Sequence, residues 1–251
     1  MKEIRYYESY GDDFENSANH NFQLPENYKW VRNDLLSKFL SGLIYGLAVS
    51  LGGAYCRFFL HVRVKGRDKL KGQKGGFFIY GNHTQPIGDV FIPAVCALPK
   101  RIYTVVGTAN YGIPVVGKIL PFLGALPIVD SLHGIKELNK AVKKRIEDGH
   151  PVVIYPEAHV WEYCTEIRPF PDTSFRFPVK LNKPAFAMTV TYKKSKFFKK
   201  PTAQVYLDGP FYPQGDSDKE KTKNLHDAVV LAMQERSKKS DCQYIVYKAK
   251  Q

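Results

Sequence analysis

Cysteine is scarce in this sequence, with only four among 251 residues. They are widely scattered, and no pair has the spacing of paired metal ligands. We therefore expect free thiols in a reducing compartment and no metal site built on cysteine. The four positions are Cys56, Cys96, Cys164 and Cys242.

Several signature motifs are missing as well. Neither Gly-x-Gly-x-x-Gly nor a P-loop is present, which argues against a nucleotide-binding protein. There is no recognisable nucleic-acid-binding motif and no Gly-x-Ser-x-Gly nucleophile motif. Residues 1–30 have no apolar core, so we expect a polar N-terminal arm, flexible or lightly docked, and no secretory signal.

Acidic residues are the scarcer charge, 24 against 37 basic ones, which gives a net charge of +13. Residues 1–30 contain more acidic than basic side chains, so the positive excess lies beyond residue 30. Such a field implies an anionic partner: nucleic acid, an anionic membrane surface or a phosphate-bearing substrate. The hydrophobic fraction of 44% is sufficient for one large domain with a sizeable core.

The longest uncharged run is Phe39–Cys56, bracketed by Lys38 and Arg57. Its length of about 18 residues is near the lower limit for spanning a bilayer. Gly42 and Gly46 form a small-xxx-small pair of the kind that packs helices in lipid. We assign residues 31–60 to a membrane-associated helical segment. A helix hairpin or re-entrant helix dipping into one leaflet, a single span and a buried core helix all remain open.

Basic residues follow this run directly, a pattern that suits the cytoplasmic face of a membrane. An ordinary solvated strand and turn is the alternative interpretation. The basic residues are Arg57, Arg63, Lys65, Arg67, Lys69 and Lys71.

From residue 61 to residue 251, short apolar runs alternate with helical patterns. This alternation predicts an α/β fold, with a single mixed-sheet domain and flanking helices. The expected strands are His61–Lys65, Phe77–Gly81, Ile102–Gly107, Leu126–Asp130, Val152–Pro156, Ala185–Tyr192 and Gln204–Leu207. The expected helices are Asp89–Ala97, Pro114–Leu120, Ile135–Asp148 and Lys219–Ser237.

Two of the expected strands end in polar side chains with catalytic potential. His83 follows the expected strand Phe77–Gly81, with Asp89 a few residues further along the chain. Glu157 and His159 follow the expected strand Val152–Pro156. The carboxyl ends of strands in an open α/β sheet are where ligands bind. A histidine can take a proton near neutral pH, and a carboxylate on its second nitrogen fixes the tautomer. The alternative interpretation is a helix start at each place, capped by Thr84 or Asp89 at the first and with Pro156 and Glu157 in the first turn at the second.

The same residues resemble the conserved blocks of the glycerolipid acyltransferase family, which includes the lysophospholipid acyltransferases. The Asn-His-x4-Asp block is similar to Asn82-His83 with Asp89, and the Phe-Pro-Glu-Gly-Thr-Arg block is similar to Tyr155–Ala158. Two further stretches resemble the remaining blocks in the same order. They are residues 112–130 and 182–188.

The resemblance implies acyl transfer from acyl-CoA or acyl-carrier protein to a hydroxyl of a lysophospholipid or glycerolipid. It implies that His83 is the general base and Asp89 its partner, without an acyl-enzyme, a metal or another cofactor. It implies a membrane-associated, glycerolipid acyltransferase-like fold on the cytoplasmic face, with an anionic lipid surface as partner and no nucleic acid. Matched positions assigned to substrate binding are Asn82, Glu157, Ala158 and His159.

The sequence departs from the family pattern in two ways. His83 and Asp89 are one residue further apart than the pattern allows, which on a regular helix would leave their side chains about 140° apart. Pro86 and Gly88 make a regular helix unfavourable there, so we expect a bulge to absorb the extra residue. The family arginines that hold the acceptor phosphate are also replaced. Candidate substitutes are Lys118, Arg168, Arg176 and Lys180.

Two other functions remain open at this point. The lysine-rich segment 193–200, with Phe197 and Phe198, suits either nucleic-acid binding or a membrane interface. A metal-dependent hydrolase is the other alternative. It would use His83, Asp89, Glu157 and His159.

Overall fold

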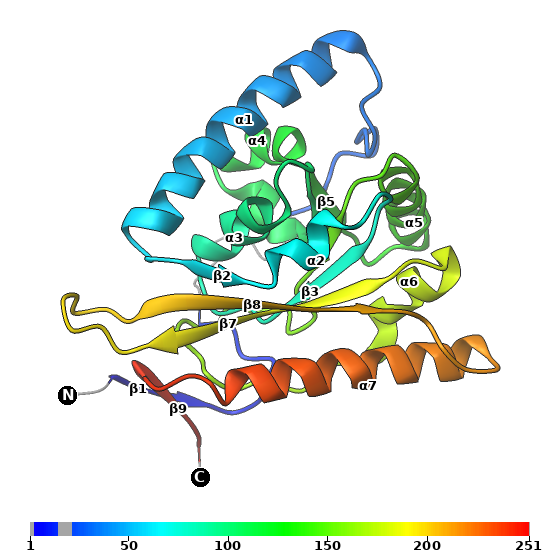
Figure 1. The fold of residues 1–251 in the computed structure, drawn as a ribbon. Helices are drawn as coiled ribbons and strands as arrows, with labels where there is room; N and C mark the ends of the chain where they lie inside the picture. Colours follow the sequence, from blue (N-terminus) through cyan, green and yellow to red (C-terminus); the bar gives the residue numbers. More distant parts are fainter. Residues whose placement is uncertain (1–2, 15–21, 251) are drawn as a thin grey trace.

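The computed structural model describes residues 3–14 and 22–250. Its main feature is a seven-stranded sheet in the order β2-β8-β7-β3-β6-β4-β5. Figure 1 shows this sheet between α1 and α3 on one side and α7 on the other. Neighbouring strands are parallel except β7 and β8, which are antiparallel, so the expected mixed sheet is confirmed. The strands are β2 (Arg63–Lys65), β3 (Phe78–Gly81), β4 (Tyr103–Gly107), β5 (Ala125–Ile128), β6 (Val152–Ile154), β7 (Ala185–Lys193) and β8 (Thr202–Phe211).

Helices cover both faces of this sheet, because alternate side chains of each central strand point to opposite faces. Phe77 and Ile79 pack in the core beneath α1 and α3, whereas Phe78 and Tyr80 pack in the core beneath α5, α6 and α7. The helices are α1 (Leu35–Phe58), α2 (Arg67–Lys71), α3 (Gly88–Ala97), α4 (Val116–Leu123), α5 (Leu132–Glu147), α6 (Arg176–Leu181) and α7 (Asp218–Ser237).

The sequence patterns did not predict α6 or the full length of β8. Helix α6 has only six residues and includes Pro178, so it lacks the several turns that make helical periodicity visible. Strand β8 extends beyond the apolar core of its sequence because it pairs along nearly the whole of β7.

The N-terminal arm is more ordered than its composition indicated. Residues Glu3–Tyr7 form β1, which pairs in parallel with β9 (Ile245–Ala249) in a separate two-stranded sheet. Trp161 anchors the arm: its indole N–H donates to the carbonyl oxygen of Asp12 at 2.8 Å, and Tyr7 and Phe14 pack on its ring. A contact between residues from opposite ends of the chain is invisible to local patterns. Residues 15–21 of the arm lie outside the described residues.

The uncharged run lies within helix α1. The exposure of this helix contradicts one of the three interpretations of the run, namely a buried core helix. Only Gly52 and Cys56 are buried, and α1 contacts the rest of the protein through α3 and α4. Leu43, Leu47 and Leu51, spaced four residues apart, are each more than 60% exposed. By length and composition α1 can cross a membrane. An apolar face of this size is unusual on a soluble surface.

Candidate active site

The structure brings His83 and Asp89 together at the carboxyl end of β3. The imidazole Nδ1 lies 2.8 Å from Oδ2 of Asp89. The same oxygen accepts hydrogen bonds from the backbone N–H groups of Thr84 and Gln85, at 2.8 and 2.9 Å. An ionised carboxylate only accepts, so the proton belongs on Nδ1 and the lone pair on Nε2.

The extra residue between His83 and Asp89 is accommodated before α3 begins. Residues 82–85 are not helical, residues 86–87 form a turn, and the helix starts only at Gly88. The expectation that a bulge absorbs the extra residue is therefore correct as geometry. The helical separation of 140° does not arise, because His83 lies outside the helix.

A tyrosine supports the His83 ring from the neighbouring strand. Tyr155 follows β6 and stacks under the imidazole, with ring centroids 4.4 Å apart. Its hydroxyl donates to the backbone carbonyl of Asp89 at 2.6 Å. Gly81 permits this approach, because a Cβ there would lie 2.6 Å from the Tyr155 ring. Tyr155 thus fixes both partners, a role that the sequence did not reveal.

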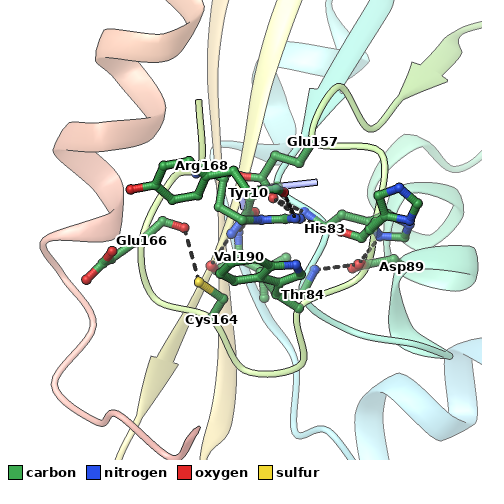
Figure 2. A network of polar contacts seen from close by, with 12 residues as sticks. Tyr10, His83, Thr84, Asp89, Glu157, Cys164, Glu166, Arg168 and Val190 are labelled. Carbon is green, nitrogen blue, oxygen red and sulfur yellow. Dashed lines mark hydrogen bonds and ion pairs between the residues drawn. The ribbon is translucent and has the colours of Figure 1, made fainter. Parts of the chain in front are cut away.

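Glu157 lies beside this pair and holds the backbone of the His83 loop (Figure 2). Its Oε2 accepts from the backbone N–H of His83 at 3.0 Å and from Nη2 of Arg168 at 2.9 Å. Its Oε1 accepts from the backbone N–H of Arg168 at 3.0 Å. Burial raises the pKa of Glu157, and Arg168 with the two N–H groups opposes that shift. The Glu157 carboxylate therefore links the loop that follows β6 to the loop that follows β3.

Arg168 has other partners than the acceptor phosphate expected of it. Its side chain is only 2% exposed, is paired with Glu157 and also donates to the carbonyl oxygen of His159. The guanidinium lies 4.7 Å from the centre of the Trp161 ring. Arg168 does not line the cavity described below. The expectation of phosphate binding is therefore corrected: a buried carboxylate needs a buried cation, and Arg168 supplies it.

A large cavity of about 720 Å³ opens beside His83 and is lined mainly by apolar side chains. His83 and Asp89 form part of its wall, and Tyr45 and Val49 of α1 form another part. The volume suits a ligand with a long apolar portion. None of the hydrogen bonds among the described residues uses Nε2 of His83, so this nitrogen is open to a ligand.

The other expected substrate-binding residues are distributed unevenly around this cavity. Ala158 and His159 line it, as do Arg176 and Lys180, which are one turn apart on α6 and exposed. Asn82 does not, because its amide pairs with the backbone N–H and carbonyl of Val190 on β7. Lys118 lines a different hollow, beside Tyr111. In the described part of the chain, no three His, Cys, Asp or Glu side chains are arranged to hold a metal ion.

Ala158 has an unusual backbone conformation. Its φ of +65° lies in the left-handed region that favours glycine. At the position matched to glycine in the block Phe-Pro-Glu-Gly-Thr-Arg, the turn after β6 therefore has a backbone conformation that glycine adopts readily, although alanine stands there.

A second tyrosine holds the other side of the His83 loop. The hydroxyl of Tyr192, fully buried at the end of β7, lies 2.7 Å from Oγ1 of Thr84 and accepts from the amide of Gln85 at 3.0 Å. The only sequence signal for this residue is its polar tip within an apolar strand, since a buried tyrosine hydroxyl needs a partner.

Comparisons with known proteins agree with this fold. A family model described as Acyltransferase matches residues 61–193, more than half of the chain. Among solved structures, the chain is similar to the crystal structure of the 1-acyl-sn-glycerophosphate (LPA) acyltransferase PlsC from Thermotoga maritima. The TM-score is 0.52 at 15% identity, over 83% of this chain and 98% of that one, so the two share a fold. The comparison with curated proteins finds no match. With a family model that matches more than half of its length, including both polar strand ends, the chain belongs to the acyltransferase family.

Proposed function

We propose that this enzyme transfers a fatty acyl group from an acyl thioester to a hydroxyl of a phosphate-bearing glycerolipid, such as a lysophospholipid. The observation that carries the proposal is the 2.8 Å contact between His83 and Asp89 at the wall of a large apolar cavity. Acyl-CoA and acyl-carrier protein are both suitable donors. The PlsC neighbour is itself described as an LPA acyltransferase.

In this mechanism Nε2 of His83 takes the proton of the acceptor hydroxyl as its oxygen attacks the thioester carbonyl. The C–O bond forms, the C–S bond breaks, and the imidazolium returns its proton to the departing thiolate. Asp89 stabilises the imidazolium and keeps its Nδ1 protonated. Tyr155 and the Thr84 and Gln85 N–H groups fix the positions of both side chains before substrate binds.

Arg176 and Lys180 are our candidates for the acceptor phosphate. They line the cavity from the exposed face of α6, four residues apart, so both can reach one ligand. Arginine binds phosphate in a bidentate manner, and lysine adds a point charge. The sequence analysis offered both Arg168 and Arg176 as candidates for binding the acceptor phosphate, and this assignment keeps Arg176 alone of the two.

We also propose that α1 attaches the enzyme to the cytoplasmic face of an anionic membrane. The hairpin between β7 and β8 lies at the C-terminal end of α1, because His61 stacks on Phe198 with ring centroids 3.8 Å apart. Phe197 is 90% exposed at the same tip, among the lysines of segment 193–200. Lysines beside exposed aromatics suit the lipid headgroup region.

The reaction is tested with purified full-length enzyme and a panel of lysophospholipids, with acyl-CoA and acyl-carrier protein as alternative donors. His83→Ala should abolish transfer while leaving the melting temperature nearly unchanged, because the side chain contributes little to the core. His133→Ala, at an exposed position on α5, serves as the control and should retain full activity. A folded His83→Ala enzyme with normal activity would exclude the mechanism.

Membrane attachment is tested separately, with exposed residues rather than a truncation, since Tyr45 of α1 also contacts the core. Replacing Leu43, Leu47 and Leu51 with glutamine should move the protein from the membrane fraction to the soluble fraction. A parallel change of Leu231, exposed on α7, should not. Unchanged partitioning of the triple variant would show that α1 does not bind lipid.

A further inference from the structure

A second cavity of about 290 Å³ lies at the opposite edge of the sheet from His83. Arg101 and Tyr103 enter its wall at the start of β4, and His150 immediately before β6. Its remaining walls are residues 28–32, the first two turns of α1, Pro121 of α4, residues 124–126 at the start of β5 and the C-terminal end of α5. Neither the proposed reaction nor the family resemblance uses this cavity, although Ala125 lines both cavities.

Positive charge dominates the lining of this second cavity. Arg32, Lys38, Arg101 and Arg145 line it, against a single carboxylate, Asp148. Within the described residues, the only carboxylate within ion-pair distance of any of these four cations is Asp148, 4.0 Å from Arg145. Asp148 also pairs with Lys144, so its charge is shared. Cations gathered in a partly buried cavity repel one another unless an anion joins them.

The two central arginines also have unused donors. Nη2 of Arg101 donates to Oγ of Ser41 and to the carbonyl oxygen of Phe122, at 2.7 and 2.6 Å. Its Nε is buried without a hydrogen-bond partner among the described residues, and so is Nε of Arg145. The ring of Tyr103 lies against both guanidinium groups, 5.3 Å from Arg101 and 4.3 Å from Arg145. Buried N–H groups without acceptors are rare, so neither guanidinium has its full set of protein acceptors.

His150 responds to the same environment. Burial lowers the pKa of His150, and the charges of Arg101 and Arg145 lower it further, against the opposing effect of Asp148. The imidazole is therefore held neutral and does not add to the repulsion.

We propose that this cavity binds a phosphate-class anion, either the headgroup phosphate of a membrane lipid or a soluble phosphate, between Arg101 and Arg145. Arg32 and Lys38 complete its charge at the cavity wall. Because Ser37, Lys38 and Ser41 belong to α1 and Arg145 to α5, a bound phosphate connects the membrane-associated helix to the catalytic domain. Arginine forks match the geometry of phosphate oxygens. The site is independent of the proposed reaction, since it requires no group at His83.

The test is thermal unfolding of the full chain in detergent, in inorganic phosphate against chloride at matched ionic strength. Phosphate should raise the melting temperature of the wild type with the logarithm of its concentration, by about 3–6 °C at ten times its dissociation constant. Arg145→Gln should remove this rise. Lys136→Gln, an equal charge change on the exposed face of α5, should retain it, and so should His83→Ala. An Arg145→Gln protein with the full rise, or an equal loss in Lys136→Gln, would overturn the proposal.

Arg145→Lys and Lys38→Gln keep the test decisive if Arg145→Gln does not fold. Both should weaken the phosphate effect several-fold while preserving the fold, and an unchanged effect in both would also overturn the proposal.

The source of the anion follows from comparing glycerol phosphate with dihexanoyl phosphatidylglycerol below its micelle concentration. Arg145-dependent stabilisation at tenfold lower lipid concentration identifies a headgroup site. If glycerol phosphate and the lipid give the same rise in melting temperature at equal concentrations, the site is one for soluble phosphate.

Discussion

Two polar pairs lie next to each other at the carboxyl edge of the sheet, and they differ in how they meet solvent. His83 and Asp89 form part of the wall of the large cavity, and the His83 side chain is 20% exposed. Glu157 and Arg168 are sealed, with side chains 0% and 2% exposed. The first pair keeps a nitrogen available for a ligand, whereas every oxygen of Glu157 is occupied by protein donors.

This difference in exposure gives the two pairs different roles, proton transfer for His83 and Asp89 and structural support for Glu157 and Arg168. An open pair can exchange a proton, but a sealed pair can only hold its neighbours in position, since its charges are stable only while both are present. The sealed pair connects the loop after β6 to the backbone of His83 itself. The precision of the open pair therefore depends on the sealed one. Four substitutions, two in these pairs and two at residues that line the cavity beside them, test this division and its surroundings, from the largest expected effect to the smallest.

Asp89→Asn should lower kcat by about three to four orders of magnitude, because an amide can stabilise the wrong tautomer of His83 and cannot balance its positive charge. The backbone N–H groups of Thr84 and Gln85 can still donate to the amide oxygen. The Michaelis constants should therefore change little. Steady-state kinetics measure this, with a circular dichroism melt to confirm folding. Retention of more than a tenth of the activity would place the orienting group elsewhere.

Arg168→Met should lower the free energy of unfolding by about 3–5 kcal/mol, because it leaves Glu157 charged and buried without its cation. Lys238→Gln breaks an exposed pair with Glu235 and should cost less than about 1 kcal/mol. Denaturant unfolding compares the two. The double variant Glu157→Gln with Arg168→Met should be more stable than the sum of the single effects. Additive losses would show that the two side chains are not coupled.

Arg176→Ala should raise the apparent Michaelis constant for a phosphate-bearing acceptor by about tenfold or more, as expected for loss of a charge-assisted contact of roughly 1.5–3 kcal/mol. A neutral monoacylglycerol should be affected much less. The melting temperature should stay the same, since Arg176 is exposed. This separates it from Arg168, whose loss should weaken stability without a preference between the two acceptors. Equal kinetics on both acceptors would move the phosphate site away from α6.

Ala158→Gly should stabilise the protein by about 0.5–1 kcal/mol. Glycine removes the strain of a left-handed alanine, although it also adds freedom to the unfolded chain. Ala141→Gly, at a buried position within α5, should destabilise it by about 1 kcal/mol or more. Opposite signs from the same substitution in one unfolding experiment would confirm the backbone argument. A destabilised Ala158→Gly protein would contradict it.

The sequence was sufficient to find the strands that carry the site. Apolar runs ending in polar residues predicted β3 and β6, and the carboxyl-edge rule predicted that His83 and Glu157 would lie close together. In the structure the backbone N–H of His83 donates a hydrogen bond of 3.0 Å to the side-chain carboxylate of Glu157. The role of Arg168 could not be predicted, because its distance from Glu157 along the chain says nothing about burial. Exposure and partners depend on how a loop folds back over the sheet.

The sequence by itself determined the alternation of strands and helices, the uncharged run of α1 and the identity of the groups at the strand ends. Those features follow from local periodicity and from side-chain chemistry. Only the tertiary structure decided which of these groups face a cavity, that α1 presents an apolar surface, and that Arg101 and Arg145 share a second cavity. The physical reason is that solvent exposure and charge pairing are properties of assembled surfaces, and residues far apart in the chain create them together.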